Sequence, residues 1–425
     1  MSRRFDVIIV GAGASGLTAG IQAARMGAHV LILEHMEKAG KKILATGNGK
    51  CNFTNEKQGI AYYNGKNPAF VLPVFRQFGV TETLRFFEEL GIYPQNLREG
   101  CYYPASGQAA SIVEVLLMEC KRLEVRILYN VGIREIRQEA EDFSFHTKQG
   151  IFESRSCIIA TGGKAAKKTG SDGSGFLYVA NLGHTLTDMV PALVQMQGKQ
   201  SFLKEIAGIR AKGKITLYIE NRKVAQDCGE LQMTEFGVSG IPAFQVSRYA
   251  SYGLLQGKRL FVILNFLPQF SKRQTVDLIK KRFLTYGKGK TAEQALVGLF
   301  PRKLISVFLT EANIPLGKKS QNCSEKDLIN LAQVIQSLRV DIIGTKGFDN
   351  AQVTAGGIDT DEINPTTMES RFVPGLFFAG EVVDIDGMCG GYNLQWAWSS
   401  GTVAGIAAVQ RMEKAEKTFQ THESL

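Results

Sequence analysis

The spacing of apolar positions near the N-terminus predicts a strand, a helix and a second strand in succession. The apolar run FDVIIV, residues 5–10, is bounded by glycine, as a buried parallel strand often is. Residues 17–26 are alanine-rich with apolar positions at helical spacing, and Gly27 is placed to end that helix. HVLILE, residues 29–34, predicts a second strand that ends in a carboxylate. Together these elements make a βαβ unit.

The middle of the chain changes period several times. Residues 125–155 alternate with a period of two, which predicts a small antiparallel meander before the apolar strand at residues 157–160. Residues 191–268 are β-rich, and we expect separate strands at LVQM, KITLYIE, KVAQ, ELQMTEF and LFVILNF. Gly, Asn and Lys turns separate these stretches, so we expect an inserted sheet or small barrel. Residues 271–338 have apolar positions at helical spacing, and residues 340–354 form a second β stretch.

The turn after the first strand has the spacing GxGxxG. Gly11 allows a tight turn, Gly13 leaves room for a pyrophosphate against the backbone, and Gly16 allows close helix packing. Glu34 can bind the two hydroxyls of an adenosine ribose, and an acid there argues against a 2′-phosphate. The predicted dinucleotide contacts are Gly11, Ala12, Gly13, Ala14, Ser15, Gly16 and Glu34.

Two distant segments favour FAD over NAD as the resident dinucleotide. CIIATGG ends a strand with ATGG, and PGLFFAGEVVDIDGMCGGYNLQWAWSSG predicts a strand, the acid Glu381, a glycine-rich turn and a helix. Strand ends of this kind, far apart in the sequence, are typical of one FAD site. No second βαβ fingerprint with a downstream acid is present, so NADH or NADPH would bind only transiently as electron donor.

Composition places the chain among ordinary globular proteins, with 44% apolar and 21% charged residues in 425. Seven cysteines without a CxxC pair and five scattered histidines encode neither a disulfide framework nor a metal site. No apolar run is long enough to span a membrane and no signal peptide is visible, so we expect a cytoplasmic protein without a membrane partner. The net charge of +10 is spread along the chain beside no recognition module, so we expect no nucleic-acid partner.

The segment GKKILATGNGKCNFTN, residues 40–55, is dense in lysine, glycine and asparagine. A P-loop is excluded because Leu44 stands where glycine is needed and Cys51 stands where Ser or Thr is needed. A reactive thiol at Cys51 stays open, although a small buried thiol is the commoner outcome. A loop that clamps a cofactor is the third interpretation. His184 is interpreted as a capping or core histidine.

These motifs, in this order and together with GELQMTEFGVSG, VTAGGI and TMES, resemble the BaiN-type family of NAD(P)/FAD-dependent oxidoreductases. That family includes bile-acid dehydro-reductase and aminoacetone oxidase members, and the resemblance runs from about Phe5 to about Gly405. It implies an α/β fold: a Rossmann-like FAD-binding domain (1–190 and 355–425) with an inserted β-rich substrate domain (191–270, returning at 339–354) and an inserted helical domain (271–338).

The resemblance also assigns residues to the cofactor. Glu381 would hold the ribityl chain, with Asp384 as an alternative, and Val131 would contact adenine. The helix that begins near Gly391 would face the N1 and C2 carbonyl region of the flavin. The full set beyond the first turn is Lys38, Lys41, Lys42, Gly47, Asn48, Gly49, Cys51, Asn52, Val131, Thr161, Gly162, Gly163, Glu381, Asp384, Gly391, Tyr392, Asn393 and Leu394.

Three functions are compatible with these motifs. The first is an FAD enzyme that takes hydride from NAD(P)H and reduces a conjugated C=C bond of a dehydro-bile acid or steroid enone. The second is an oxidase of a small amine such as aminoacetone that produces hydrogen peroxide, and the third is a flavin-binding electron-transfer or interaction protein. The candidate contacts for a small-molecule substrate are Glu230, Thr234 and Tyr392. No residue stands out as the catalytic acid or base, and the oligomeric state cannot be inferred from the sequence.

Overall fold

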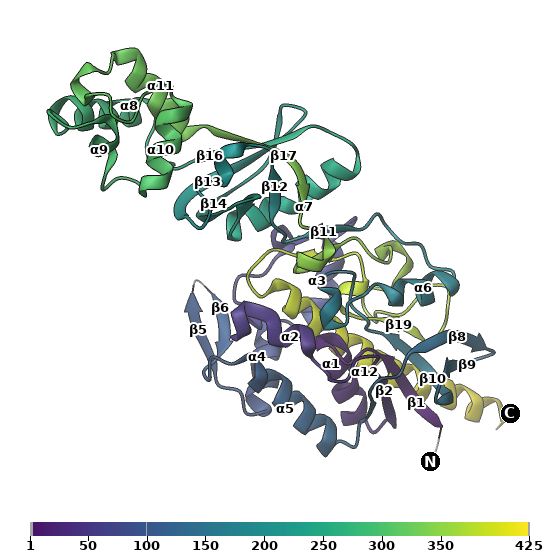
Figure 1. Ribbon diagram of the computed structural model, residues 1–425. Coiled ribbons are helices and arrows are strands. Elements are labelled where there is room, and N and C mark those ends of the chain that lie inside the picture. The colour runs from purple at the N-terminus through teal and green to yellow at the C-terminus, as the bar shows by residue number, and fades with distance from the viewer. Residues whose placement is uncertain (1–2, 99, 424–425) are drawn as a thin grey trace. The chain divides into compact units, whose positions relative to one another are not determined.

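The computed structural model describes residues 3–98 and 100–423, and the chain divides into two compact units (Figure 1). Unit 1 comprises Met1–Met189 and Val353–Leu425, and unit 2 comprises Val190–Gln352. Unit 2 is therefore an insertion in unit 1, and the expected β-rich and helical insertions both fall within it.

Unit 1 is built on a mixed sheet with the strand order β7-β2-β1-β10-β9-β8, in which β19 also pairs with β10. The strands from β7 to β10, and β19, run parallel, whereas β10, β9 and β8 form the antiparallel meander. Their bounds are β1 Arg4–Val10, β2 Val30–Leu33, β7 Arg126–Leu128, β8 Ile133–Glu139, β9 Asp142–Thr147, β10 Gly150–Ile159 and β19 Leu376–Phe378.

Strand β10 explains why one stretch of sequence has two patterns. Its first half pairs with β9 and alternates between buried and exposed residues, as an antiparallel strand does when one of its faces is exposed to solvent. Its second half, from Ser156 to Ile159, lies between β1 and β19 and is buried throughout. The meander and the apolar strand predicted separately are thus joined in a single strand.

Unit 1 also has helices, and it has small strands outside this sheet. The helices are α1 Ala14–Arg25, α2 Lys41–Ala45, α3 Val71–Gln77, α4 Val80–Glu89, α5 Ala109–Arg122, α6 Ser174–Asn181 and α12 Tyr392–Glu423. Strands β3 (Thr54–Asn55), β6 (Cys101–Pro104) and β5 (Pro94–Arg98) form a small sheet, and β4 (Tyr63–Asn64) pairs with β20 (Asp386–Gly387). Strand β18 is Val353–Ala355.

Helix α12 lies against α1 at backbone contact. A Cβ atom added at Gly401 would lie 2.4 Å from the carbonyl oxygen of Ser15, and one added at Gly405 would lie 2.4 Å from that of Ala19. The two glycines are four residues apart and so occupy the same helix face. This contact ties the C-terminal helix to the first helix of the chain.

Unit 2 contains a closed barrel with the order β12-β15-β14-β13-β16-β17. Figure 1 shows helices α8 to α11 gathered at one end of this unit. Its strands are β11 Val190–Ala192, β12 Met196–Gly198, β13 Arg210–Ile219, β14 Arg222–Thr234, β15 Gly237–Ser239, β16 Leu260–Asn265 and β17 Leu338–Thr345. Its helices are α7 Ile241–Leu255, α8 Lys272–Lys280, α9 Ala292–Leu296, α10 Arg302–Glu311 and α11 Glu325–Gln336.

Two local expectations were wrong. KVAQ and ELQM were expected in separate strands, but the half-buried Asp227 and the exposed Gly229 between them continue one strand, β14, because β13 pairs with it along its length. Residues 40–55 were expected to form a loop, yet they contain helix α2 and a short 3-10 turn from Thr46 to Gly49. Burial of the Ile43 side chain stabilises helix α2 against the rest of the unit.

Gly405→Ala tests the contact between α12 and α1. Alanine is favoured over glycine inside a helix by about 1 kcal/mol, so propensity alone predicts a more stable protein. The added methyl would meet the Ala19 oxygen, and we expect a loss of about 2 kcal/mol in the free energy of unfolding, measured in urea. Gly317→Ala is the control, because a Cβ there meets nothing within 4 Å. A stabilised Gly405→Ala variant would refute the contact.

Candidate cofactor and active site

The carboxyl ends of the parallel strands bring the predicted site residues to one edge of the sheet. Gly11 follows β1, Glu34 follows β2, and Val131 lies just beyond β7. Thr161 follows β10, and Glu381 follows β19 by three residues. Parallel strands end at the same edge, which is where ligands bind in open α/β sheets.

The three glycines of the first turn have different constraints. Gly11 has a left-handed backbone (φ 103°), and a Cβ there would lie 2.6 Å from the Ala160 oxygen. A Cβ at Gly16 would lie 1.9 Å from the Gly11 oxygen. Gly13 has an ordinary φ of −83°, and a Cβ there would meet nothing within 4 Å. The fold itself therefore requires Gly11 and Gly16, whereas Gly13 borders open space.

That open space lies at the N-terminus of α1. The helix has no side-chain cap and no acidic residue in its first turn. The Ser15 hydroxyl donates instead to the Ala379 carbonyl, 3.3 Å away. The first N–H groups of such a helix have no partner within it and attract phosphate oxygens. The backbone from Gly13 to Ser15 is thus suited to a pyrophosphate.

Glu34 is a buried carboxylate held by the backbone. One of its oxygens accepts from the Ala12 N–H at 2.7 Å, and the other accepts from the Met36 N–H at 2.8 Å. The Val131 N–H donates to the Glu34 carbonyl at 2.9 Å, and this hydrogen bond holds Val131 beside Glu34. A carboxylate has about four lone-pair sites, so two oxygens fixed in this way can still accept from ribose hydroxyls.

Glu381 and Lys42 form an ion pair of 2.7 Å (Nζ to Oε2). The Thr354 N–H donates to the other Glu381 oxygen at 2.9 Å, and Lys42 also donates to the Ala165 carbonyl at 3.3 Å. A Cβ added at Gly163 would lie 2.7 Å from Glu381. Thr354, in the VTAGGI motif, positions the acid, a role that sequence reasoning did not assign to it.

The other lysines of this segment have no contact with Glu381. Lys41 is half-buried and pairs with Glu37, four residues earlier, at 3.0 Å, and Lys38 is exposed. The backbone of residues 47–49 is exposed as well, and Asn48 has a left-handed conformation (φ 54°). Their predicted contact with the pyrophosphate and the flavin stays a prediction.

Two buried polar atoms in this region have no hydrogen-bond partner among the described residues: the Asn52 amide oxygen Oδ1 and the Thr161 hydroxyl. A Cβ added at Gly391 would lie 3.0 Å from Asn52 Oδ1, and one at Gly175 would lie 1.9 Å from the Thr161 oxygen. A buried polar group without a partner costs about 1–3 kcal/mol. A ligand that offers hydrogen bonds here would offset that cost. Gly162 lies beside Thr161 and has a left-handed backbone (φ 72°).

The start of α12 closes the other side of Asn52. The Tyr392 ring stacks on Tyr62 with centroids 4.7 Å apart and an interplanar angle of 8°. The Asn393 side chain accepts from the Gly387 N–H and donates to the Gly387 carbonyl, both at 2.8 Å, so it holds the preceding turn. Leu394 packs on the core. The side chain of Asn393 thus holds the turn, and its backbone in the first turn of α12 is the part that we expect to contact a ligand.

Residues 5–407 match the model of the family described as HI0933-like protein Rossmann domain. The chain belongs to the HI0933-like family. It is 43% identical to the 3-dehydro-bile acid delta(4,6)-reductase of Clostridium scindens, over 95% of this chain and 98% of that one. It is 30% identical to the ribosomal RNA dihydrouridine synthase of Haemophilus influenzae, over 96% of this chain and 99% of that one. It is 31% identical to the enzyme of the same name from Escherichia coli, over 93% of this chain and 96% of that one.

A solved structure supports the same fold for this HI0933-like chain. The 3-ketosteroid-delta4-(5alpha)-dehydrogenase of Rhodococcus jostii, in complex with 4-androstene-3,17-dione, aligns with a TM-score of 0.52 at 16% identity. The alignment covers 96% of this chain and 97% of that one. The Rossmann-like FAD-binding fold and the BaiN-type resemblance are confirmed, and the protein is a flavin oxidoreductase.

The described residues fit FAD. The open space at Gly13, the fixed carboxylate of Glu34 and the unpartnered Asn52 and Thr161 are the features that a dinucleotide with a polar ring edge requires. Over residues 3–98 and 100–423, no group of three His, Cys, Asp or Glu side chains is arranged to hold a metal ion. Within the same residues, no helix has the length and apolarity that a membrane span needs.

Cys51 does not have the environment of a reactive thiol. It is fully buried, and this burial raises the pKa of its thiol to about 12. The thiolate is the nucleophilic form, and roughly one thiol in 10,000 would be ionised at pH 8. The redox interpretation is therefore disfavoured, and packing beside the site is the role that the geometry supports.

The two substrate candidates in unit 2 have local partners. Glu230 pairs with Arg210 at 3.1 Å on the exposed surface of the barrel. The Thr234 hydroxyl donates to the Gly237 carbonyl at 3.0 Å and so fixes the hairpin between β14 and β15. Their contact with a substrate stays a prediction.

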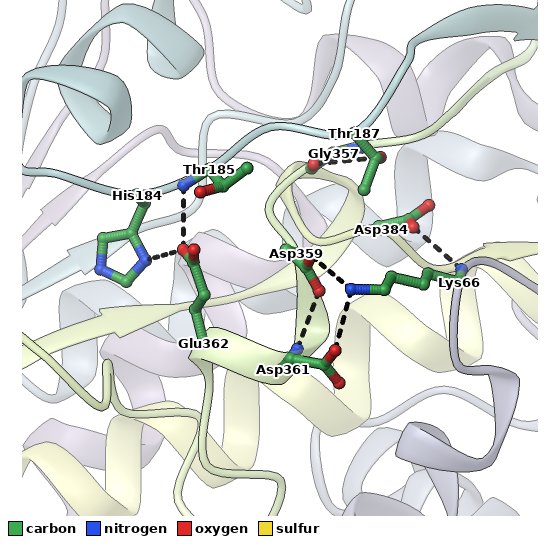
Figure 2. A network of polar contacts seen from close by, with 9 residues as sticks. All are labelled: Lys66, His184, Thr185, Thr187, Gly357, Asp359, Asp361, Glu362 and Asp384. Carbon is green, nitrogen blue, oxygen red and sulfur yellow. Dashed lines mark hydrogen bonds and ion pairs between the residues drawn. The ribbon is translucent and has the colours of Figure 1, made fainter.

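Asp384 belongs to a network that ties residues 64–66 to the segment after β18 (Figure 2). One Asp384 oxygen accepts from the Lys66 N–H at 2.9 Å. The Lys66 ammonium donates to Asp359 at 2.7 Å and Asp361 at 2.8 Å, and these hydrogen bonds raise the pKa of Lys66. This contact gives Asp384 a structural role, and Glu381 is the better candidate for the ribityl chain.

His184 is a core residue, as its sequence context indicated. Figure 2 shows its ring facing Glu362, with Nδ1 2.9 Å from a carboxylate oxygen. Its Nε2 lies 2.9 Å from the Ser370 hydroxyl. The carboxylate can only accept, so the neutral ring donates from Nδ1 and accepts at Nε2. Burial lowers the pKa of His184 from its ordinary value of 6.5.

Gly13→Val separates a cofactor role from a folding role. The apoprotein has room for the side chain at an allowed φ, so its melting temperature should change by no more than about 2 °C. A valine there fills the space for the pyrophosphate, so FAD content measured by absorbance should be nearly lost. The matched Gly16→Val variant should fail at folding instead. Full FAD content in Gly13→Val would contradict the assignment.

Stability should decline in mild acid because of His184. Its folded pKa lies below 6.5, so the unfolded chain binds the proton first. The contribution is fully present above pH 6.5 and is lost as the pH falls below it, by up to about 1.4 kcal/mol per pH unit. Urea unfolding at a series of pH values measures this. His184→Gln should be less stable at pH 7 and show a flatter acid limb; an unchanged limb would assign the decline to other groups.

Proposed function

We propose that this flavin oxidoreductase reduces a carbon–carbon double bond conjugated to a carbonyl, with NADH or NADPH as transient electron donor. The observation that carries the proposal is the 43% identity, over nearly both full chains, with a 3-dehydro-bile acid delta(4,6)-reductase. A dehydro-bile acid or steroid enone is accordingly the first substrate class.

A second substrate class is uracil within RNA. Two relatives named as ribosomal RNA dihydrouridine synthases match over 93% or more of this chain. Dihydrouridine is uridine with a saturated C5–C6 bond, and that bond is conjugated to the C4 carbonyl. Both classes therefore need the same addition: a hydride at the carbon β to the carbonyl and a proton at the α carbon.

When bound, FAD supplies hydride transfer. The chain's own part is to hold the cofactor and to supply the proton. The N-terminus of α1 would bind the pyrophosphate, Glu34 the ribose, and Glu381 the ribityl chain. The N-terminus of α12 would offer backbone donors to the flavin and would stabilise negative charge that develops on it.

Tyr392 is our candidate for the proton donor. Its ring is fixed by stacking on Tyr62 at the start of α12. Burial, with a smaller contribution from Tyr62, raises the pKa of Tyr392, so its hydroxyl stays protonated across the physiological range. A phenol of this kind can protonate the α carbon or donate to the carbonyl oxygen.

The test uses holoprotein under nitrogen with NADH or NADPH and two substrates, a 3-oxo-4,6-diene bile acid and an unmodified ribosomal RNA transcript. Mass spectrometry should detect the gain of two hydrogens in at least one substrate. Tyr392→Phe should retain FAD and lower turnover by about 10²-fold or more. Peroxide produced from aminoacetone in air, with neither substrate reduced, would favour the amine oxidase instead.

A further inference from the structure

The positive charge of the chain is concentrated in unit 2. Residues 190–352 contain 24 lysines and arginines against 12 aspartates and glutamates, a formal net charge of +12. The rest of the chain contains 26 against 28, a net charge of −2. The cations form no blocks along the sequence, yet they divide unequally between the two folded units. Charge asymmetry of this size indicates an anionic partner for the insertion.

Within unit 2, two lysine-bearing loops lie side by side. The first, YGKGK at residues 286–290, follows the helical turn after α8, and the second, LGKKSQ at residues 316–321, precedes α11. The Ser320 N–H donates to the Lys290 carbonyl at 3.0 Å, and its hydroxyl donates to the Gly287 carbonyl at 2.6 Å. The Ala292 N–H donates to the Lys318 carbonyl at 2.8 Å. We call these two segments the lysine loops.

The lysine loops present positive charge to solvent. Lys288, Lys290 and Lys319 are exposed, and no carboxylate of the described residues lies within ion-pair distance of their ammonium groups. Lys318 is the exception, because it pairs with Asp327 at 2.8 Å. The hydrogen bonds between the loops fix their backbones, so the three exposed lysines project from paired segments of chain.

An exposed aromatic ring adjoins these cations. Tyr286 is 58% exposed, and the Lys281 ammonium lies 5.3 Å from its ring centroid. Lysines beside an exposed aromatic ring are the combination used to hold a nucleic-acid backbone and stack an unpaired base. Lysines that served only to solvate a helical surface would require neither two hydrogen-bonded loops nor an exposed aromatic ring beside them.

The barrel offers a weaker alternative. A cavity of about 490 Å³ on its surface is lined by Lys199, Lys258, Arg259 and Arg339, among others. Two of these cations are neutralised, since Arg259 pairs with Glu220 and Arg339 pairs with Asp341. The lysine loops therefore have the greater uncompensated charge.

We propose that the lysine loops bind the phosphate backbone of an RNA substrate. This inference rests on the proposed function, of which it selects the RNA substrate class. A bile acid has one carboxylate on an apolar skeleton, so it can pair with only one of the three exposed cations on the lysine loops. An RNA has a phosphate at each nucleotide, and the counterions released when lysines neutralise these phosphates supply much of its affinity.

The test is fluorescence anisotropy of a labelled, unmodified ribosomal RNA transcript with holoprotein, across a range of salt concentrations. The variant K288E/K290E/K319E removes the three exposed lysines. The matched control R85E/K121E/K148E makes the same charge change at exposed sites of unit 1. We expect the loop variant to bind roughly 100-fold more weakly at about 0.1 M salt and to reduce the slope of log affinity against log salt by about 3. The control should bind within about threefold of the parent protein.

Three outcomes would overturn the inference. The first is an equal loss of RNA affinity in both variants, which indicates a non-specific charge effect. The second is a parent protein that binds vesicles containing phosphatidylglycerol through these lysines but does not bind RNA, and the third is a loop variant in which only the KM for NADPH changes. Reduction of a small enone by the loop variant is measured in parallel. If it is unchanged while RNA binding is absent from every protein, the RNA inference fails and the proposed reductase function stands. If no substrate is reduced while RNA still binds through the loops, the proposed function fails instead.

Discussion

The turn between β1 and α1 is the constraint on which unit 1 depends. Gly11 lies against the backbone that follows β10, and Gly16 lies against Gly11, so strand, turn and helix meet without an intervening side chain. Helix α12 then lies on the same helix through Gly405. The first and last helices of the unit are therefore fixed relative to the central sheet. The N-terminus of α1 is held at the carboxyl edge of the sheet, where its free N–H groups can bind an anion.

Every other feature of the cofactor site follows from that edge. Glu34 and Thr161 begin the loops after β2 and β10, and Glu381 follows β19. Backbone N–H groups orient the two carboxylates. The Asn52 Oδ1 and Thr161 hydroxyl oxygens are buried without a hydrogen-bond partner in the described part of the chain, and a bound cofactor would offset this cost. The unit is thus organised around a ligand, and its chemistry is that of a flavin oxidoreductase.

The sequence predicted those parts of the fold in which local pattern and burial agree. The βαβ unit, the meander and the helix at the C-terminus follow from periodicity and glycine spacing. It could not predict that β14 is a single strand, because pairing with β13 overrides the polar residues at its centre. It also could not show that Lys42 would pair with Glu381 across 339 residues, or that Thr354 would hold that acid. Such contacts depend on chain segments meeting in space, for which a single sequence has no signal.

The concentration of positive charge in unit 2 could not be recognised until the bounds of the units were known. The lysines and arginines form no blocks along the sequence, but when they are counted by unit, the insertion carries all of the excess positive charge. Unit 1 has the residues that fit the cofactor, and unit 2 carries the net positive charge on which the proposed RNA contact depends.

The central claim is that unit 1 binds a dinucleotide through the turn at Gly13 and the carboxylate of Glu34. Calorimetric titration of the apoprotein with FAD, FMN and riboflavin tests it most directly, because only FAD has both the pyrophosphate and the adenosine ribose. The account predicts that FAD binds at least about 100-fold more tightly than FMN, a difference of about 2.7 kcal/mol. Equal or tighter binding of FMN would contradict it.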